Sequence, residues 1–326
     1  MQFGVGMIRR RFLQSLLVCA GAGKVLTACS PPTEPLRFGA NAWPGYAPLR
    51  LAEASGLISP ERLRVLDFPN SSMVLSAFRN GTIDAAGLTL DEALALAASR
   101  QPLRIVLVFD VSDGADVIVA RPGISALDQL EGCRVGVETE ALGAYLIGRA
   151  LERVSLPLHS VEIVSMPLDR HESAFASGQV DALVTFEPVR SRLLEAGASE
   201  LFSSREIPGE IVDVLVVRED VLRTRRADLQ AAVSAHFEAR LALLADPAAA
   251  AERLGARLSL DEVALRAALG LIQLPGPEEN RRLLGGADAG LAQVLVTMSS
   301  RMKSLGLLEG ELVLKGMLVA DLVEAV

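Results

Sequence analysis

"SAFRNGTIDAAGLT" occupies residues 76–89, and a close copy, "SAFASGQVDALVT", returns 97 residues later at residues 173–185. Both copies share the frame S-A-F-x-x-G-x-[I/V]-D-A. In each copy an apolar helix end is followed by a glycine, Gly81 or Gly178, at the position where a helix C-terminus commonly takes a positive φ. Each copy therefore begins as the end of a helix followed by a tight turn.

The second part of each copy is typical of a strand. It runs from Asp84 to Thr89 in the first copy and from Asp181 to Thr185 in the second, and a new helix is predicted after each threonine. Two such units predict two sheets of similar construction, one in each of two lobes. The alternative is a chance likeness between two common helix–strand units.

Short apolar runs alternate with helical patterns through the first two thirds of the chain. This alternation predicts parallel, doubly wound α/β sheets. Helical patterns fall at residues 47–55, 71–79, 91–99, 141–154 and 169–177. The predicted strands are residues 36–41, 63–68, 83–88, 103–110, 115–120, 133–138, 161–165, 181–186 and 212–217.

From about residue 219 the strand patterns stop and Ala- and Leu-rich helical patterns follow. "LPGPEEN" at residues 274–280 is predicted to be a break between helices. The last third of the chain is therefore expected to be helical.

The N-terminus is typical of an export signal. "MIRRRFLQ" (7–14) is followed by an apolar run at residues 12–23, too short for a stable bilayer span, and by "LTAC" (26–29), which resembles a bacterial lipobox. We expect residues 1–28 to be removed, Cys29 to be lipidated and residues 29–35 to form a tether. The expected location is the periplasm or the cell surface, anchored to the membrane through the lipid alone. An uncleaved membrane anchor is the alternative.

The charge of the remaining chain excludes some partners. Residues 1–28 carry four basic and no acidic side chains, so 28 basic and 40 acidic side chains remain, a net charge of −12. Such a balance argues against nucleic acid and anionic lipid headgroups as partners.

Ligands of open α/β sheets bind beyond the carboxyl ends of the strands, near helix N-termini. Trp43, the only tryptophan of the chain, and Tyr46 lie in such a loop and are candidates for the wall of a small-molecule site. The alternative for Trp43 is packing of the loop onto its own lobe. Seven acids lie at or beside predicted strand ends: Asp91, Asp110, Asp113, Asp116, Glu138, Glu187 and Asp213.

Each of these acids also has a structural interpretation, as a helix cap, a first-turn residue or a turn residue. If several converge, carboxylates beside aromatic rings suit a cationic or nitrogen-bearing ligand. The three histidines are scattered, and G-x-S-x-G, P-loop and G-x-G-x-x-G patterns do not occur. We therefore expect a binding protein that is not an enzyme and uses no metal or cofactor.

Several stretches, in their order behind the lipobox, resemble the nitrate/sulfonate/taurine-type substrate-binding proteins of ABC importers, a group similar to the thiamine-pyrimidine precursor binders. The likeness extends from about residue 36 to the C-terminus. The stretches are "GANAWPGYAPLRLAEASGLI", "GTIDAAGLTLDEALAL", "LDQLEGCRVGVE", "SAFASGQVDALVTFEP" and "IPGEIVDVLVV".

The resemblance implies a type II periplasmic-binding fold, two doubly wound lobes joined by two crossovers, with a helical C-terminal third. Lobe I would comprise residues 36–115 and 214–326, and lobe II residues 116–213. The ligand would bind between the lobes and close them. The matching cleft positions are Trp43, Tyr46, Asn70, Ser71, Thr89, Asp110, Ser112, Asp113, Glu138, Leu142, Gly143, Tyr145, Thr185, Glu187 and Asp213.

The resemblance also implies a monomer that delivers its ligand to ABC permease and ATPase subunits. These loops lack an obvious Arg or Lys, so an amine or nitrogen heterocycle is favoured over a nitrate or sulfonate, which stays an alternative. A sensor for a membrane signalling partner is a second alternative. An enzyme similar to the fungal pyrimidine-precursor synthases is a third, and it would require a cleft histidine and a cysteine-rich iron motif.

Overall fold

The computed structural model describes residues 34–140, 142–258, 260–285 and 290–326. The predicted export signal (1–28) and Cys29 lie outside these residues, as does most of the predicted tether. Among the helices described, none combines the length and the apolar character needed to cross a bilayer.

The first sheet is built mostly from the N-terminal strands, and its order is β11-β4-β10-β3-β1-β2. β1 pairs in parallel with both β2 and β3, whereas β10 runs antiparallel to its neighbours β3 and β4. Its strands are β1 (Leu36–Ala40), β2 (Leu63–Asp67), β3 (Ala85–Thr89), β4 (Leu103–Ser112), β10 (Val212–Arg218) and β11 (Ile272–Gln273).

The second sheet has the order β7-β6-β8-β5-β9. β6 pairs in parallel with β7 and β8, and β5 runs antiparallel to β8 and β9. Its strands are β5 (Asp116–Ala120), β6 (Arg134–Val137), β7 (Glu162–Ser165), β8 (Ala182–Phe186) and β9 (Ser199–Ser203).

The two sheets repeat one arrangement. The order β4-β10-β3-β1-β2 in the first corresponds to β9-β5-β8-β6-β7 in the second. The chain passes from β4 into the second sheet at β5 and returns from β9 into the first sheet at β10. Each sheet thus receives one strand from the far side of a crossover, and that strand is antiparallel.

The structure confirms all nine predicted strands and corrects their orientation. The prediction of purely parallel sheets was wrong for β5 and β10. Each of these strands enters its sheet from the other sheet and runs antiparallel to its neighbours. β9 and β11 were not predicted. The expected lobe boundary between residues 213 and 214 falls inside β10, so Asp213 belongs to a strand of the first sheet.

Matching ion pairs hold the two copies of the repeated phrase. Asp84 accepts from the backbone N–H of Arg37 at 3.0 Å and from its guanidinium at 2.7 and 3.0 Å. Asp181 accepts from Arg134 in the same way, at 2.9, 2.8 and 3.0 Å. The repeat is therefore structural: each phrase is bound to the equivalent strand of its own sheet, β1 in the first and β6 in the second.

The glycines of the phrase take the expected conformation, with φ of 71° at Gly81 and 78° at Gly178. This left-handed backbone is strained for side chains with a Cβ, so glycine ends the helix before each strand.

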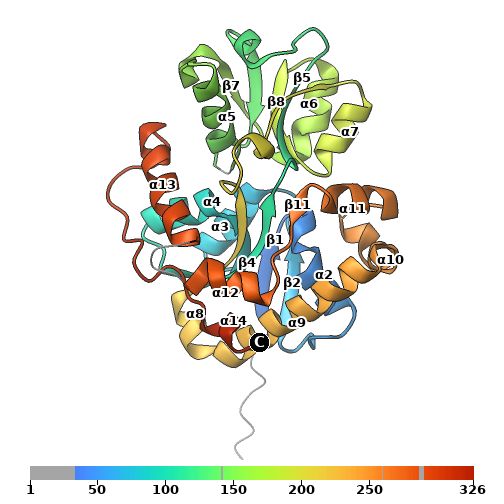
Figure 1. Cartoon of the computed structure of the whole chain (residues 1–326), viewed down its shortest axis with the longest axis vertical. Helices are drawn as coiled ribbons and strands as arrows, with labels where there is room; N and C mark the ends of the chain where they lie inside the picture. Colours follow the sequence, from blue (N-terminus) through green and yellow to red (C-terminus); the bar gives the residue numbers. More distant parts are fainter. Residues whose placement is uncertain (1–33, 141, 259, 286–289) are drawn as a thin grey trace, which may run out of the picture. The chain divides into compact units, whose positions relative to one another are not determined.

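Helices pack on the sheets and make up most of the C-terminal third (Figure 1). α12 begins inside the predicted break at residues 274–280, because Pro277 fits the first turn of a helix and two glutamates follow it. The longer helices are α2 (Ala47–Ala54), α3 (Ser71–Arg79), α4 (Leu90–Ala98), α5 (Leu142–Arg153), α6 (His171–Ser177), α7 (Val189–Glu195), α8 (Glu219–Thr224), α9 (Arg226–Ala245), α10 (Pro247–Leu258), α11 (Glu262–Leu269), α12 (Pro277–Gly285) and α13 (Leu291–Ser304); a short α14 (Asp321–Glu324) follows.

Candidate ligand-binding site

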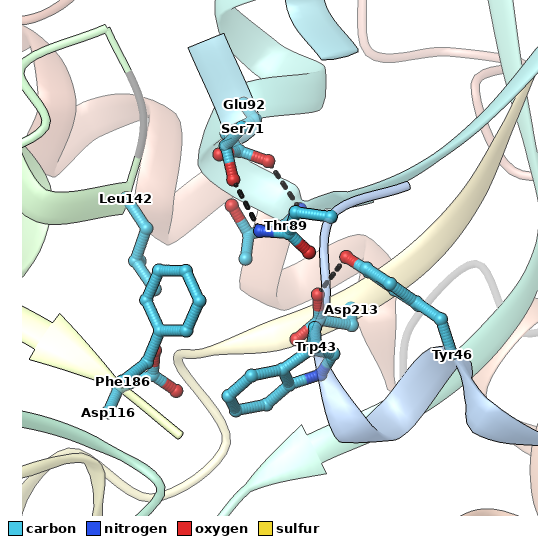
Figure 2. A pocket seen from close by; sticks show the side chains of 10 residues that line it. Trp43, Tyr46, Ser71, Thr89, Glu92, Asp116, Leu142, Phe186 and Asp213 are labelled. Atoms are coloured by element: carbon cyan, nitrogen blue, oxygen red, sulfur yellow. Dashed lines mark hydrogen bonds between the residues drawn. The ribbon is translucent and has the colours of Figure 1, made fainter. Parts of the chain in front are cut away.

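Two adjoining cavities lie between residues of the first sheet and residues of the second. The first cavity, of about 20 Å³, is lined by Asn41, Trp43, Tyr46, Ser71, Thr89, Glu92, Asp116, Leu142, Phe186 and Asp213. In Figure 2, Leu142, Phe186 and Asp116 stand opposite Thr89, Trp43 and Asp213. The second cavity, also of about 20 Å³, shares four of these residues and adds Glu138, Gly143, Leu146, His171, Val184 and Thr185.

A short loop and 3-10 turn, η1 (Pro44–Tyr46), carry the aromatic wall of the first cavity. A Cβ on Gly45 would lie 1.7 Å from Asp110 Oδ2, so only glycine lets the loop approach β4 this closely. A Cβ on Gly87 would lie 2.8 Å from the ring of Tyr46. The two glycines therefore set the positions of both aromatic rings.

Trp43 lines the cavity and also packs onto its own half of the molecule. Its ring is 3% exposed, and its Nε1 donates to Asp110 Oδ2 at 2.9 Å. Its ring also meets the edge of Phe186, from the second sheet, with centroids 5.7 Å apart. Trp43 thus packs onto its own half, and its ring also contacts the second half.

Buried carboxyl groups converge behind the aromatic wall. Asp213 and Asp110 face each other across β10 and β4, and the Tyr46 hydroxyl donates to Asp213. Burial raises the pKa of both carboxyls well above the usual range, and their mutual repulsion raises that of Asp213 further. Two like charges directly opposite in a sheet are unfavourable, so the pair favours a state in which one of the two carboxyls is protonated.

Two more acids complete this cluster. Burial raises the pKa of Asp116 to about 7 and that of Glu92 to about 8, and Asp91 repels both carboxylates. Glu92 accepts from the backbone N–H of Thr89 at 3.0 Å, the bond that a glutamate makes in a capping box at the start of a helix. A cation bound in the first cavity would lower the pKa of these carboxyl groups and favour their ionised form.

The second cavity is polar on one side. Glu138, which follows β6, accepts from the backbone N–H and the hydroxyl of Ser72 at 2.8 and 2.7 Å. His171 Nδ1 lies 3.2 Å from Thr185 Oγ1, and burial lowers the pKa of this histidine to about 4, so it is neutral. A Cβ on Gly143 would lie 2.9 Å from Val137, which explains the glycine at the start of α5.

Buried polar atoms that lack a partner in the described part of the chain are common to the two cavities, and besides the Thr89 hydroxyl and His171 Nε2 they include three acceptors. Asn41 Oδ1, Asp116 Oδ2 and Glu138 Oε2 are buried and have no hydrogen-bond partner among the described residues. Leaving a buried acceptor unpaired costs about 1–3 kcal/mol. No group of three or more His, Cys, Asp or Glu side chains within the described ranges is arranged to hold a metal ion. The arrangement suits a ligand that brings N–H donors.

Of the residues predicted from the sequence, ten line these cavities or lie directly behind them: Trp43, Tyr46, Ser71, Thr89, Asp110, Glu138, Leu142, Gly143, Thr185 and Asp213.

The other predicted residues have partners elsewhere. Asn70 caps α3 and donates to Asp169 at 3.0 Å. Ser112 is 2.8 Å from Ser204, and the half-exposed Asp113 pairs with Arg205 at 3.6 Å. The remaining two, Tyr145 and Glu187, also point away from these cavities.

Tyr145 donates to Glu210 at 2.7 Å and lines a separate cavity between α5 and α13. Glu187 is buried against Arg190 and Ser191, at 3.1 and 2.8 Å. Helix-face direction explains Tyr145, which is turned by about 100° around α5 from its neighbour Leu146, a residue that lines the second cavity.

The sequence predicts that Thr89 and Thr185 are equivalent ends of the two repeated strands, and this equivalence is wrong by one residue. Thr89 pairs with Asp213, and the residue that pairs with Asp116 in the second sheet is Phe186. Because successive strand residues point to opposite faces, Thr185 turns toward His171 in α6.

Asp116 is the main cavity residue absent from the predicted site, although it was noted as a strand-end acid. The chain held a signal for it: "DVIVAR" at residues 116–121 returns as "DVLVVR" at residues 213–218, at the same spacing of 97 residues as the opening phrase. Glu92 and Phe186 were also missed, and they follow Thr89 and Thr185 closely in the sequence.

The chain matches a family model described as the NMT1-like family over residues 30–257. A putative binding protein of Brucella abortus (strain 2308) is 28% identical over 218 residues, 63% of this chain and 66% of that protein. The taurine-binding periplasmic protein of Escherichia coli (strain K12) is 24% identical over 208 residues, 61% of this chain and 64% of that protein. The match thus spans less than two thirds of the length of these relatives.

Solved structures share the fold at lower identity. The alkanesulfonate-binding protein SsuA from Xanthomonas axonopodis pv. citri, bound to MOPS, has a TM-score of 0.74 at 19% identity and covers 89% of this chain and 100% of its own. The desulfurization enzyme DszB has a TM-score of 0.65 at 18% identity, over 90% and 98%. These likenesses establish the predicted periplasmic-binding-protein fold.

Proposed function

Since the chain belongs to the NMT1-like family, we propose that it is the solute-binding component of an ABC importer. Its ligand is a small polar molecule with an amine or a nitrogen heterocycle, held in the two adjoining cavities. The permease and ATPase subunits of the importer are its partners, and it acts as a monomer.

The unpaired acceptors of the two cavities are the observation that carries the nature of the ligand. Asn41 Oδ1, Asp116 Oδ2 and Glu138 Oε2 require donors, and an ammonium or amino group supplies two or three N–H bonds at once. The Trp43 ring beside the carboxyl cluster favours a cation as well. Hydrogen bonds from a charged donor to such groups are worth about 1.5–3 kcal/mol each.

The relatives support a binding role and leave room for this ligand class. Taurine, named for the relative from Escherichia coli, carries an ammonium group, and MOPS, bound to SsuA, carries a ring nitrogen. Both molecules also carry a sulfonate, so a sulfonate ligand is the second candidate. The N-terminus of α3 at Ser71, on the cavity wall, is the observation that favours it.

Hinge closure is part of the proposal. The two halves are joined by the crossovers between β4 and β5 and between β9 and β10, and the cavities lie between them. A ligand that touches Asp213 on one side and Asp116 on the other draws the halves together.

Matched probes test the proposal: ethanolamine carries the ammonium alone, isethionate the sulfonate alone, taurine both, and 4-aminopyrimidine a heterocyclic amine. Calorimetry with the purified protein should show binding of an amine probe, accompanied by a change in fluorescence of Trp43. Binding of isethionate alone would favour the second candidate. Failure of every probe to bind or to raise the melting temperature would refute the proposal.

The proposal has two further parts. The protein binds its ligand without altering it, and a lipid on Cys29 anchors it to the membrane. Because DszB shares the fold and is an enzyme, the bound probe should be recovered and its mass compared with that of the starting material. The full chain expressed in a bacterium should partition into detergent, and Cys29→Ser should move it to the aqueous phase. An altered probe, or an unchanged partition of C29S, would overturn the respective part.

A further inference from the structure

Glu138 crosses from the second sheet to a helix of the first. It follows β6, yet its Oε1 accepts from the backbone N–H and the hydroxyl of Ser72, at 2.8 and 2.7 Å, in the first turn of α3. The neighbouring first-turn N–H, that of Met73, is taken by the cap residue Asn70 at 3.0 Å. A carboxylate of the protein itself thus occupies the N-terminus of α3.

That helix N-terminus opens onto the proposed ligand site. Ser71, the first residue of α3, lines both cavities, and Glu138 lines the second. Helix N-termini attract anions through their free N–H groups and the helix dipole. An anionic group of a ligand would therefore be drawn to this position, where it would meet the carboxylate of Glu138.

The second oxygen of Glu138 is available to a ligand. The residue is 5% exposed, and its Oε2 has no hydrogen-bond partner among the residues described. Both oxygens of the carboxylate thus favour a ligand with a donor group over an anionic ligand. Oε1 occupies the position at the N-terminus of α3 that an anion would take, and Oε2 is free to accept a hydrogen bond from the ligand.

We propose that Glu138 is the residue that sets the charge preference of the site, by excluding an anionic group from the N-terminus of α3 and accepting an N–H bond from the ligand. The inference rests on the proposed function, because it names the group that separates an amine ligand from a sulfonate.

Glu138→Gln is the informative variant. Glutamine is isosteric, so its amide oxygen still accepts from Ser72, while its amide nitrogen places a donor where Oε2 was. Calorimetry should show ethanolamine bound roughly 10- to 100-fold more weakly, the value of one charge-assisted hydrogen bond. Isethionate should bind roughly 10-fold or more tightly than to the wild type. Taurine should change less than either.

Glu140→Gln is the matched control. Glu140 lies two residues further along the same loop, has a side chain 65% exposed and pairs with Arg79 at 3.4 Å. The substitution Glu140→Gln removes the same charge at a residue that lines neither cavity. The affinities for ethanolamine and for isethionate should therefore stay within about 2-fold of wild type. Glu138→Ala, which clears the N-terminus of α3, should also gain isethionate and covers the case in which E138Q folds poorly.

The outcomes separate the inference from the proposed function. Amine binding by the wild type that E138Q leaves unchanged, or variants that gain no isethionate, overturn the inference alone. Equal effects of E138Q and E140Q also overturn it, because they assign the change to net charge. A wild type that binds none of the probes overturns both.

Discussion

Replacing Asp116 by asparagine should stabilise the protein at pH 8 and leave its stability almost unchanged at pH 4. The carboxyl is 2% exposed, its Oδ2 has no partner among the described residues, and burial raises its pKa to about 7 from an ordinary 3.8. Asp91 and Glu187 repel its charge and add to the rise. Asparagine keeps the shape and cannot ionise.

The sign follows from proton binding. The folded protein holds the Asp116 proton more tightly than the unfolded chain does. The stability from this proton is fully present below about pH 4 and is lost as the pH rises through about 7. At about 1.4 kcal/mol for each pH unit between the two values, the loss is on the order of 4 kcal/mol. Asp116→Asn escapes this loss, which corresponds to a melting temperature about 10 °C higher at pH 8.

Urea unfolding from pH 4 to pH 8 measures the effect. The free energies of unfolding of wild type and D116N should coincide near pH 4 and diverge up to pH 8. Asp113→Asn is the control, since Asp113 lies in the same crossover with a side chain 48% exposed. D113N should follow wild type within about 0.5 kcal/mol. Curves for D116N and wild type that stay parallel across this range would refute the assignment of a buried, ionising carboxyl.

Four further substitutions test the scaffold around the site. Arg37→Ala and Arg134→Ala should each lower the free energy of unfolding by about 1 kcal/mol, because each arginine makes the same three bonds to the aspartate of its phrase. Arg37 also donates to the carbonyl of Gly81 at 3.1 Å, so a clearly larger loss for Arg134→Ala in urea unfolding would contradict the equivalence. Gly45→Ala should cost about 1–3 kcal/mol and shift tryptophan fluorescence, because its Cβ would overlap Asp110; an unchanged spectrum would contradict this. Tyr145→Phe should leave the affinity for an amine probe within about 2-fold in calorimetry, since its hydroxyl faces another cavity.

The positions of strands could be predicted because a buried strand is a short apolar run between turn residues. Their directions could not, because a run of apolar residues reads the same in either direction of pairing. β9, "SELFS", was missed because it alternates polar and apolar residues weakly, and β11 because it has only two residues. "LPGPEEN" carries break residues and yet starts a helix, since Pro277 needs no intrahelical N–H bond at that position.

The candidate site was predictable at the level of loops and less so at the level of side chains. Trp43 and Tyr46 lie where the strand-end rule puts them. Tyr145 and Glu187 lie in the expected segments and point elsewhere, because a one-residue step turns a helix side chain by about 100° and a strand side chain to the other face. The sequence carries the spacing of such residues but only weakly their absolute direction.

The repeat nevertheless reaches into the site. Asp116 and Asp213 start "DVIVAR" and "DVLVVR", and each pairs with the last residue of the neighbouring strand, Phe186 or Thr89. Both aspartates line the first cavity, one from each sheet. The carboxyl groups that a ligand would meet on its two sides are therefore equivalent positions of one duplicated plan.

The C-terminal ends of β5 and β10 show how each strand is held in the sheet into which it crosses. Arg121 follows β5 directly and donates to the carbonyl of Phe175, and Arg218 is the last residue of β10 and donates to the carbonyl of Phe78 at 3.0 Å. Each guanidinium also lies over the ring of the same phenylalanine, at 5.4 and 5.8 Å. The repeated phrase thus binds the arginine that follows or ends the strand crossing from the other sheet. Because the aspartate lies five residues before that arginine, this contact places the aspartate at the cavity. The phrase therefore positions the two acids as well as building the scaffold.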